Sequence, residues 1–371
     1  MDTRIRNPHE RIFDLVRGRT VNVPDLQAMM EHWPADTNPN LELLESATKA
    51  RFEWLFPGAE NQKRLKKMHK TYAALFAAMW WPYAPVEALY TAAWLSIWLF
   101  VWDDETDSAE FSDIVYDFDR ACDFRTETLR FIRESLRLPD NSDSRDCPSP
   151  SDSTASLGPE NIFIYNFEDV GRAVSEFENG RLAAKFYDEL EVFVKMTELE
   201  QKVHLSGELP TVSEYLERRM GSSGVHVCLV LTEYAYQIEI PDAVYHETEM
   251  KVLWHETNMN ISVCNDILSA KKELQVGQTD SLIPLLAVEL GSVQSALDVA
   301  SKMLQDSVIA IDAAADALLA RHARDTALCA NLQKFIDGCK YACTANLNWS
   351  VVSGRYKLGC DSLKGGIQIQ L

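Results

Sequence analysis

The sequence predicts an all-α protein, on three observations. Apolar residues recur with helical spacing along most of the 371 residues. No sustained alternation of apolar and polar residues, the pattern of a β-strand, is found, and there is no internal repeat. With 46% hydrophobic residues the chain has ample apolar content for a core. We therefore expect a single helical domain over residues 1–371.

The same periodicity places the individual helices in chain order. In the first part of the chain we expect helices near 25–32, 41–56, 61–79, 86–107 and 112–136. Pro82 and Pro85 bracket the turn before the fourth of these helices, and residues 86–107 contain neither Gly nor Pro. In the second part we expect helices near 167–179, 182–205, 212–220, 225–236, 243–274, 292–321 and 327–352. Thr211 and Glu214 form the pattern of a capping box at the start of helix 212–220.

Two segments fall outside the helical pattern. Residues 139–160 read PDNSDSRDCPSPSDSTASLGPE and are nearly devoid of apolar residues, so burial cannot repay the cost of ordering them. A domain linker would have this composition too, but helical patterning resumes in the same style on both sides. We therefore expect a mobile surface insertion at 139–160 within one domain, and a weakly patterned tail at 357–371.

Charge and cysteine content exclude several classes of function. The net charge of −20 argues against binding to nucleic-acid backbones or to an anionic membrane surface. The longest apolar run, 86–102, is too short for a membrane span and contains Glu87. The eight cysteines include no CxxC pair, so neither a zinc site nor a redox pair is indicated. With no secretory signal visible, we expect a cytoplasmic protein, monomeric or homodimeric.

An acidic cluster ends the apolar run. Four of the five residues Asp103, Asp104, Glu105, Thr106 and Asp107 are acidic. On a helix Asp103 and Asp107 share a face, where like charges repel by a few tenths of a kcal/mol or more. Mg²⁺ would remove that penalty and would recruit phosphate oxygens of a substrate. The alternative is a helix that ends in solvent, as expected for residues 113 and 117, which have the same spacing in a polar segment.

A second candidate site lies on the helix expected at 243–274. Asn265, Ser269 and Glu273 are four residues apart, on one helical face, and offer an amide oxygen, a hydroxyl and a carboxylate. These are the ligands that Mg²⁺ accepts, although an ordinary polar face has the same spacing equally often.

Two shorter signals complete the pattern. Arg355 and Tyr356 can donate to phosphate oxygens. Gly221 and Gly224 interrupt a helical stretch, which indicates either an inter-helix turn or backbone groups freed for a ligand.

Together these motifs resemble those of a known family. Residues 103–107, DDETD, fit the DDxxD pattern, residues 265–273 fit NDxxSxxKE, and Arg355–Tyr356 fits a terminal RY pair. Their order and separations resemble the class I terpene synthases, especially fungal sesquiterpene synthases, from about Lys67 to Leu358. The resemblance implies an all-α bundle around a central apolar cavity.

The resemblance also implies a role for each motif residue. Three Mg²⁺ ions would be expected, held by Asp103 and Asp107 on one side and by Asn265, Ser269 and Glu273 on the other. The diphosphate would be held by Arg219, Lys272, Arg355 and Tyr356. Arg219 is favoured over Arg218 as the diphosphate-sensing residue because it lies nearer the helix break. Either Ser223 or Gly224 would place a backbone group near the substrate.

Aromatic rings would line the cavity beyond the diphosphate. Phe100 lies one turn from Asp103, and Trp349 precedes Arg355 by a short helical stretch. Both are expected to line the substrate cavity, with ordinary core packing as the alternative. Trp98 and Trp102 lie on other faces of their helix and are assigned to the core.

The function implied is that of a Mg²⁺-dependent terpene cyclase. It would ionise a linear prenyl diphosphate, with farnesyl diphosphate the favoured substrate, and cyclise the carbocation to a sesquiterpene with release of diphosphate. One alternative is a chain-elongating prenyltransferase of the same fold, a class that uses two DDxxD motifs. Another is a non-catalytic helical scaffold, which would leave the three ordered motifs unexplained.

Overall fold

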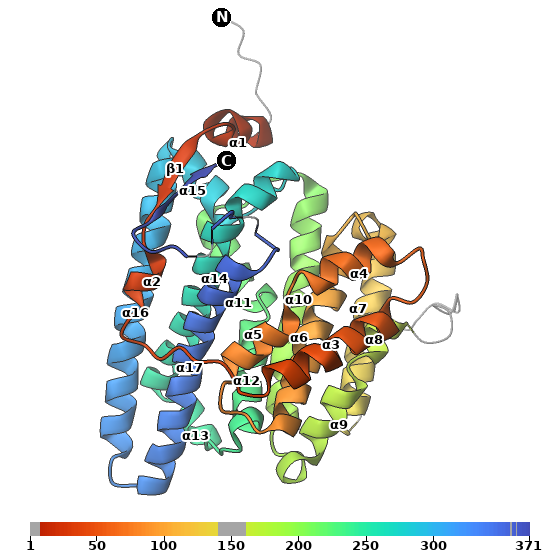
Figure 1. Ribbon diagram of the computed structural model, residues 1–371, viewed down its shortest axis with the longest axis vertical. Helices are drawn as coiled ribbons and strands as arrows, with labels where there is room; N and C mark the ends of the chain where they lie inside the picture. Colours follow the sequence, from red (N-terminus) through yellow and green to blue (C-terminus); the bar gives the residue numbers. More distant parts are fainter. Residues whose placement is uncertain (1–7, 140–160, 357, 361) are drawn as a thin grey trace, which may run out of the picture.

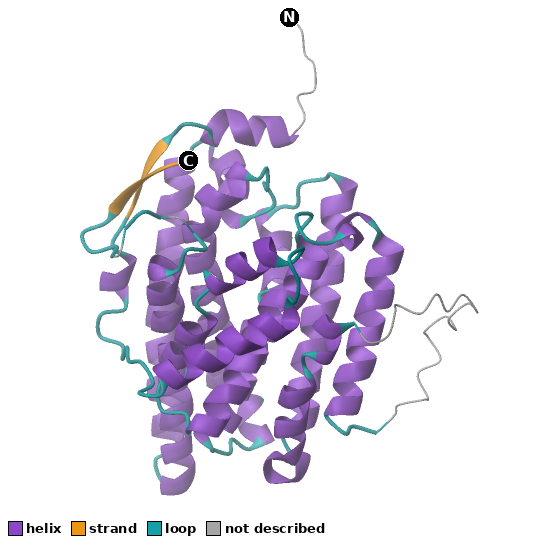
Figure 2. Cartoon of the chain, turned by 45° about the vertical axis from the view of Figure 1, so that its right-hand side comes forward, coloured by secondary structure: helices purple, strands orange, loops and turns teal. Residues whose placement is uncertain are grey.

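Helices build almost the whole molecule in the computed structural model, which describes residues 8–139, 161–356, 358–360 and 362–371 (Figure 1). Long helices run side by side, and short helices close the ends and one side of the bundle (Figure 2). The all-α expectation is confirmed, since the strands of the described residues form only one two-stranded sheet.

The elements follow one another in this order. The first half contains α1 (Pro8–Val16), β1 (Thr20–Val23), α2 (Leu26–Met29), α3 (Leu41–Leu55), α4 (Gln62–His69), α5 (Ala73–Trp80), α6 (Val86–Asp107), α7 (Phe118–Ser135), α8 (Ile162–Tyr165) and α9 (Glu168–Glu176). The second half contains α10 (Ala183–Ser206), α11 (Val212–Ser222), α12 (Val225–Tyr236), α13 (Asp242–Tyr245), α14 (Thr248–Gln275), α15 (Leu282–Leu290), α16 (Val293–His322), α17 (Thr326–Val352) and β2 (Ile367–Gln370). Short 3₁₀ turns lie at Asp113–Tyr116 and Phe177–Gly180.

Most of the expected helices are confirmed, and α6 matches its expected bounds at both ends. The capping box of Thr211 and Glu214 is present at the start of α11. The helix expected at 61–79 is instead two helices, because Tyr72 takes a left-handed conformation with φ of 50° that ends the helical path. The helix expected at 243–274 is likewise divided, by a turn at His246 and Glu247 between α13 and α14.

Five elements were not expected from the sequence: α1, β1, α8, α15 and β2. α15 is almost entirely apolar, so it shows no amphipathic period, and its Pro284 lies in the first turn, where the ring is tolerated. α1 was also not among the helices expected from the apolar periodicity. The tail expected to be weakly patterned contains β2, which is only four residues long. Of the expected insertion at 139–160, residues 140–160 lie outside the described residues.

The two-stranded sheet joins the two ends of the described chain. β1 and β2 are antiparallel, with Val21 opposite Ile369. The backbone N–H of Asn22 donates to the Gln294 side chain of α16 at 2.8 Å, which ties the sheet to the bundle. The segment after Arg355 and Tyr356 is thereby anchored at its far end.

α6 is the central helix of the core. It packs against α3, α5, α9 and α12, and most of its residues are buried. Trp98 and Trp102 are fully buried, as expected for core residues. A second, smaller apolar cluster includes two residues of α6 that precede its acidic end; we call it the satellite cluster. Its buried members are Phe52, Leu55, Phe56, Met68, Ala73, Ile97 and Val101.

Among the described residues, none of the helices is both long enough and apolar enough to cross a membrane.

A buried carboxylate links three helices near the start of α10. Glu233 of α12 is fully buried and accepts from Arg181 at 3.0 Å, from Lys185 at 3.1 Å and from the hydroxyl of Tyr245 at 2.8 Å. The backbone N–H of Ile240 donates to the same carboxylate at 3.0 Å. Each Glu233 oxygen therefore has two donors, which offsets the cost of burying the charge.

We expect Glu233→Ala to lower the free energy of unfolding by about 3 kcal/mol or more, because it leaves partly buried cations without their shared acceptor. Urea denaturation measures this loss. Glu178→Ala is the matched control, since Glu178 binds the same Arg181 at 2.9 Å but is exposed. It should cost less than about 1 kcal/mol. Equal losses in the two variants would show that burial of Glu233 is not what stabilises the network.

Candidate active site

Three segments that are far apart in the sequence meet at Asn265 of α14. Arg219, near the end of α11, donates from Nη2 to the Asn265 Oδ1 at 3.0 Å. The Asn265 Nδ2 donates to the hydroxyl of Tyr356 at 2.6 Å. The structure thus brings together a residue of the predicted NDxxSxxKE motif, one of the RY pair and the arginine before the helix break.

Arg355 connects this group to the acidic end of α6. Its guanidinium carbon lies over the Phe100 ring, 5.4 Å from the centroid. Removal from water and the charge of Asp107 together raise the pKa of Asp103 to about 8, although Arg355 acts in the opposite direction. Desolvation also raises the pKa of Asp107, and Lys272 of α14 opposes that rise. The α6 and α14 motifs therefore act on each other electrostatically.

Several oxygens at this site have no partner among the residues that the structure describes. Ser269 Oγ and Glu273 Oε2 are buried and make no hydrogen bond, and the same is true of Asp104 Oδ2. A buried acceptor without a partner costs about 1–3 kcal/mol. An oxygen-seeking cation would satisfy such atoms and would also relieve the repulsion between Asp103 and Asp107. The residues present therefore fit a hard divalent cation.

The types of side chain present also indicate which metal ion the site suits. Within the described residues, no group of three His, Cys, Asp or Glu side chains converges as a ready-made metal site. A cation at α6 would rest on Asp103 and Asp107, and one at α14 on Asn265, Ser269 and Glu273. Both sets leave coordination positions open for water or for oxygens of a bound anion, which suits Mg²⁺ better than Zn²⁺.

The basic side chains beside these carboxylates can bind a polyanion. Burial and the nearby Arg355 lower the pKa of Lys272 to about 8. The Nε atoms of Arg219 and Arg355 are buried and lack a hydrogen-bond partner within the described part of the chain. A diphosphate placed here would supply acceptors for these donors and would favour the charged form of Lys272.

The structure separates the two candidate arginines of α11. Arg218 donates to Asp280, in the loop after α14, at 2.7 Å. Arg219 bonds Asn265 and lies 3.5 Å from the carboxylate of Asp266. This geometry favours Arg219, as does its position in the sequence next to the helix break.

The helix break is narrower than the sequence pattern suggested. α11 continues through Gly221 to Ser222, and only Ser223 and Gly224 lie between α11 and α12. Ser223 Oγ donates to the Asn258 Oδ1 of α14 at 2.9 Å. Gly224 has φ of 69°, and a Cβ there would lie 3.5 Å from Leu99 of α6. Ser223 therefore contacts α14, and Gly224 lies near α6, the two helices that carry the acidic motifs.

Aromatic rings pack next to Arg355. Phe100 and Trp349 are stacked, with centroids 5.8 Å apart and planes 5° from parallel. Phe76 of α5 meets both rings edge-on, at 5.5 Å and 5.0 Å. Trp349 is fixed by its Nε1, which donates to the backbone carbonyl of Thr71 at 2.6 Å. Sequence reasoning missed Phe76, because nothing in its apolar run distinguishes it from its neighbours.

Sequence reasoning also missed polar residues behind the motif residues. Burial raises the pKa of Glu200 in α10 to about 7, with Arg219 acting in the opposite direction and Asp107 in the same direction as burial. Tyr215 of α11 donates to the Asp266 Oδ2 at 2.8 Å, so Asp266 joins α14 to α11. Glu200 lies in a helix rich in acidic residues, and no spacing rule singles it out.

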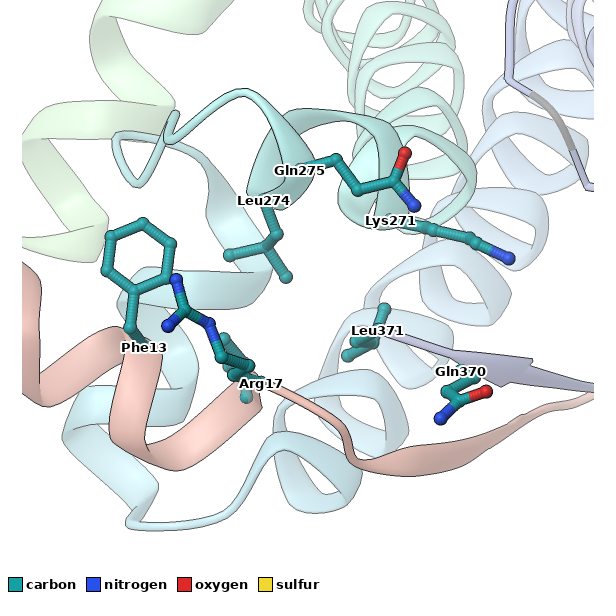
Figure 3. Close-up of a pocket in the computed structure, with 8 residues that line it drawn as sticks. Phe13, Arg17, Lys271, Leu274, Gln275, Gln370 and Leu371 are labelled. Carbon is teal, nitrogen blue, oxygen red and sulfur yellow. The ribbon is translucent and has the colours of Figure 1, made fainter.

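A pocket of about 450 Å³ lies elsewhere, between α1, β2 and the end of α14 (Figure 3). Phe13, Arg17, Lys271 and Gln275 are among its lining residues. Lys271 and Gln275 lie on a different face of α14 from the face that carries Asn265, Ser269 and Glu273. The pocket is therefore separate from the candidate active site.

Comparisons with known proteins identify the family of the chain. The family model described as terpene synthase family 2, C-terminal metal binding, matches residues 95–309. Over 363 residues the chain is 32% identical to the sesquiterpene cyclase hepA of Aspergillus oryzae, covering 95% of this chain and 93% of that protein. It is 24% identical to the silphinene synthase peniA of Penicillium patulum, covering 92% and 87%.

Solved structures show the same fold. A linalool/nerolidol synthase from Streptomyces clavuligerus matches with a TM-score of 0.70 at 15% identity, covering 85% of this chain and 98% of that chain. A single-residue variant of cucumene synthase matches with a TM-score of 0.68 at 18% identity, covering 88% and 99%. From the family match, the identity to a cyclase along nearly the whole chain and the shared fold, we conclude that the chain belongs to the terpene synthase family and is a class I terpene synthase.

Proposed function

We propose that this protein is a Mg²⁺-dependent sesquiterpene cyclase acting on farnesyl diphosphate, with residues 1–371 forming one catalytic domain. The observation that carries the proposal is the position of Asn265. It binds Arg219 and Tyr356, and on the same helix face Ser269 and Glu273 each have a buried oxygen that finds no partner among the described residues. A metal-bound diphosphate would satisfy these groups together.

Each group has a distinct part in the proposed ionisation. Arg219, Lys272 and Arg355 would hold the diphosphate, with the Tyr356 hydroxyl as a neutral donor, and would stabilise the negative charge that grows as the allylic C–O bond breaks. Mg²⁺, when bound, would neutralise further charge on this leaving group.

The aromatic rings would act on the hydrocarbon part of the substrate. The faces of Phe100 and Trp349 stabilise a nearby cation without offering a nucleophile. Phe76 supports both rings, and their apolar surface would exclude the water that quenches a carbocation early. A Cβ on Gly224 would lie 3.5 Å from Leu99, the neighbour of Phe100. The break between α11 and α12 would therefore border the space that holds the hydrocarbon part of the substrate.

The substrate assignment draws on the relatives. HepA is named a sesquiterpene cyclase, and sesquiterpenes contain the fifteen carbons of farnesyl diphosphate. A chain-elongating prenyltransferase is disfavoured because the residues at 265–273 read NDILSAKKE in the place where that class has a second DDxxD.

Incubation with farnesyl diphosphate and Mg²⁺, followed by gas chromatography with mass detection, tests the proposal. We expect a cyclic C15 hydrocarbon or alcohol, and no product when EDTA replaces Mg²⁺. A longer prenyl diphosphate in the presence of isopentenyl diphosphate would instead indicate the elongating enzyme. Absence of turnover with any prenyl diphosphate would contradict both.

Removing a proposed metal ligand should abolish turnover without unfolding the protein. We expect Asp103→Asn and Glu273→Gln each to lower kcat/KM by about a hundredfold or more, as for loss of one electrostatic stabiliser. Steady-state kinetics at varied Mg²⁺ measures the loss, and thermal melting checks the fold. Asp113→Asn, in the 3₁₀ turn after α6, should behave like wild type. A harmless Asp103→Asn beside a damaging Asp113→Asn would refute the assignment.

Replacing an aromatic ring should change what is made more than whether ionisation occurs. An aromatic face contributes roughly 0.5–2 kcal/mol to a nearby cation, which corresponds to a few-fold up to about thirtyfold in partitioning between products. We therefore expect Phe100→Leu and Trp349→Leu to release diphosphate at appreciable rates while forming more acyclic or early-quenched products. Diphosphate release and product profiles are measured in the same reactions. Wild-type profiles from both variants would assign these rings to ordinary core packing.

A further inference from the structure

The end of α6 carries more negative charge than a helix terminus ordinarily tolerates. Asp103, Asp104, Glu105 and Asp107 lie in its last turns, and no basic residue accompanies them there. The C-terminal end of a helix is the negative end of its dipole, so acidic side chains there are unfavourable. Burial strengthens the repulsion, because nearby charges are screened less than in water. The turn therefore needs compensating cations from elsewhere in the chain.

α4 supplies two of these cations. Arg64 Nη1 donates to the Glu105 Oε1, and Arg64 Nη2 donates to the backbone carbonyl of Val101 at 3.3 Å. Lys67 Nζ lies 3.5 Å from the Asp104 Oδ1. One guanidinium thus holds both a side chain and a backbone carbonyl of the last turns of α6.

This pairing divides the four carboxylates into two pairs. Asp104 and Glu105 are engaged by α4. Within the part of the chain that the structure describes, Asp103 and Asp107 form no ion pair within 4.0 Å. Residues 103 and 107 share a helical face, so the carboxylates of Asp103 and Asp107 repel each other. A divalent cation can bridge these two carboxylates.

Arg64 is itself held in a rigid setting. Its guanidinium carbon lies 5.0 Å from the ring centroid of Phe56, 5.3 Å from that of Phe111 and 4.6 Å from that of Phe163. We call these three rings the aromatic cage. They come from the end of α3, the segment after α6, and α8, and Phe56 belongs to the satellite cluster. Arg64 is only 6% exposed and Glu105 only 9%, so the pair cannot rearrange freely in solvent.

We propose that Arg64 is a positioning residue for the metal site. By holding Glu105 and the Val101 carbonyl inside the aromatic cage, it fixes the last turns of α6 so that Asp103 and Asp107 face the divalent cation. Glu105 lies two residues from each of these aspartates, so a rotation or fraying of this turn would displace both. The inference rests on the proposed function and extends it to a residue that touches neither metal nor substrate.

The test replaces the ion pair with apolar side chains in the double variant Arg64→Met/Glu105→Leu. Replacing both partners of a buried ion pair by apolar residues is often neutral for stability, whereas removing one partner is not. The melting temperature without ligands reports on folding. Calorimetric titration of Mg²⁺ in the presence of inorganic diphosphate gives the half-saturating Mg²⁺ concentration without any turnover.

We expect the double variant to fold and its half-saturating Mg²⁺ concentration to rise about tenfold or more, the scale seen when an outer partner of a metal ligand is lost. An unchanged concentration in the folded double variant would overturn the proposal. If the double variant does not fold, Arg64→Lys decides: lysine keeps the charge but lacks the fork that holds two acceptors at once. The half-saturating concentration should then rise in Arg64→Lys, and a wild-type value would overturn the proposal.

Arg51 of α3 provides a matched control. Its guanidinium also lies over two aromatic rings, Trp54 and Trp94, and it bonds Asn166 at 2.7 Å and Asp169 at 2.8 Å. Arg51→Met should lower the melting temperature and leave the half-saturating Mg²⁺ concentration unchanged. An equal rise in this control would assign the effect to general loosening of the fold and overturn the proposal.

The same titration separates this inference from the proposed function. Wild-type protein that binds Mg²⁺ and diphosphate, together with a folded double variant that binds them equally well, would refute only the positioning role. Wild-type protein that binds neither would refute the proposed function.

Discussion

The concentration of negative charge at the buried end of α6 is the constraint on which the rest of the site depends. A helix of 22 residues passes through the core and ends in carboxylates, at the end where its own dipole is negative. Two of these carboxylates are paired with cations of α4, and the others remain unpaired among the described residues. Desolvation and the charge of Asp107 raise the pKa of Asp103, so the folded protein alone does not favour full ionisation. A divalent cation bound between Asp103 and Asp107 would remove the repulsion between their carboxylates.

Basic side chains lie in the same site as these carboxylates. Arg219, Lys272 and Arg355 are buried here. Burial lowers the pKa of Lys272 to about 8, whereas in Arg219 and Arg355 the charges of neighbouring groups outweigh burial and raise the pKa. In a chain with net charge −20, three buried basic side chains in one site form a group of donors to which an anion can bind. Proposed metal ligands together with anion donors in one site favour a ligand that brings both charges together, as a metal-bound diphosphate does. The charge arrangement thus agrees with the family to which the chain belongs.

Aromatic packing couples this polar end to the apolar interior. Phe100 lies beneath Arg355 and stacks on Trp349, while Phe76 closes the group from α5. The Trp349 indole is held by the carbonyl of Thr71, just before α5 begins. The same left-handed Tyr72 that divides α4 from α5 therefore lies next to the residue that orients a ring of the proposed cavity wall. α4, before this break, supplies the cations that pair with the acidic end of α6. α5, after it, supplies Phe76, which packs against Phe100 and Trp349.

The sequence by itself determined the helical class, the bounds of α6 and the motif residues, because these depend on local spacing. A residue four positions along a helix shares a face with the first wherever the helix lies, so Asp103 with Asp107, and Asn265 with Ser269 and Glu273, could be paired from the sequence. The choice of Arg219 over Arg218 followed in the same way from its distance to the break. Its bond to Asn265 and the bond of Arg218 to Asp280 agree with that choice.

Only the tertiary structure decided which distant groups meet. Arg64 and Glu105 are 41 residues apart, and Phe76 and Trp349 belong to helices at opposite ends of the sequence. The pairing of β1 with β2 likewise joins the two ends of the described chain, through strands too short to show a period. Local periodicity carries no information about such contacts, because they depend on how whole helices pack and on which side chain fills a space left by another.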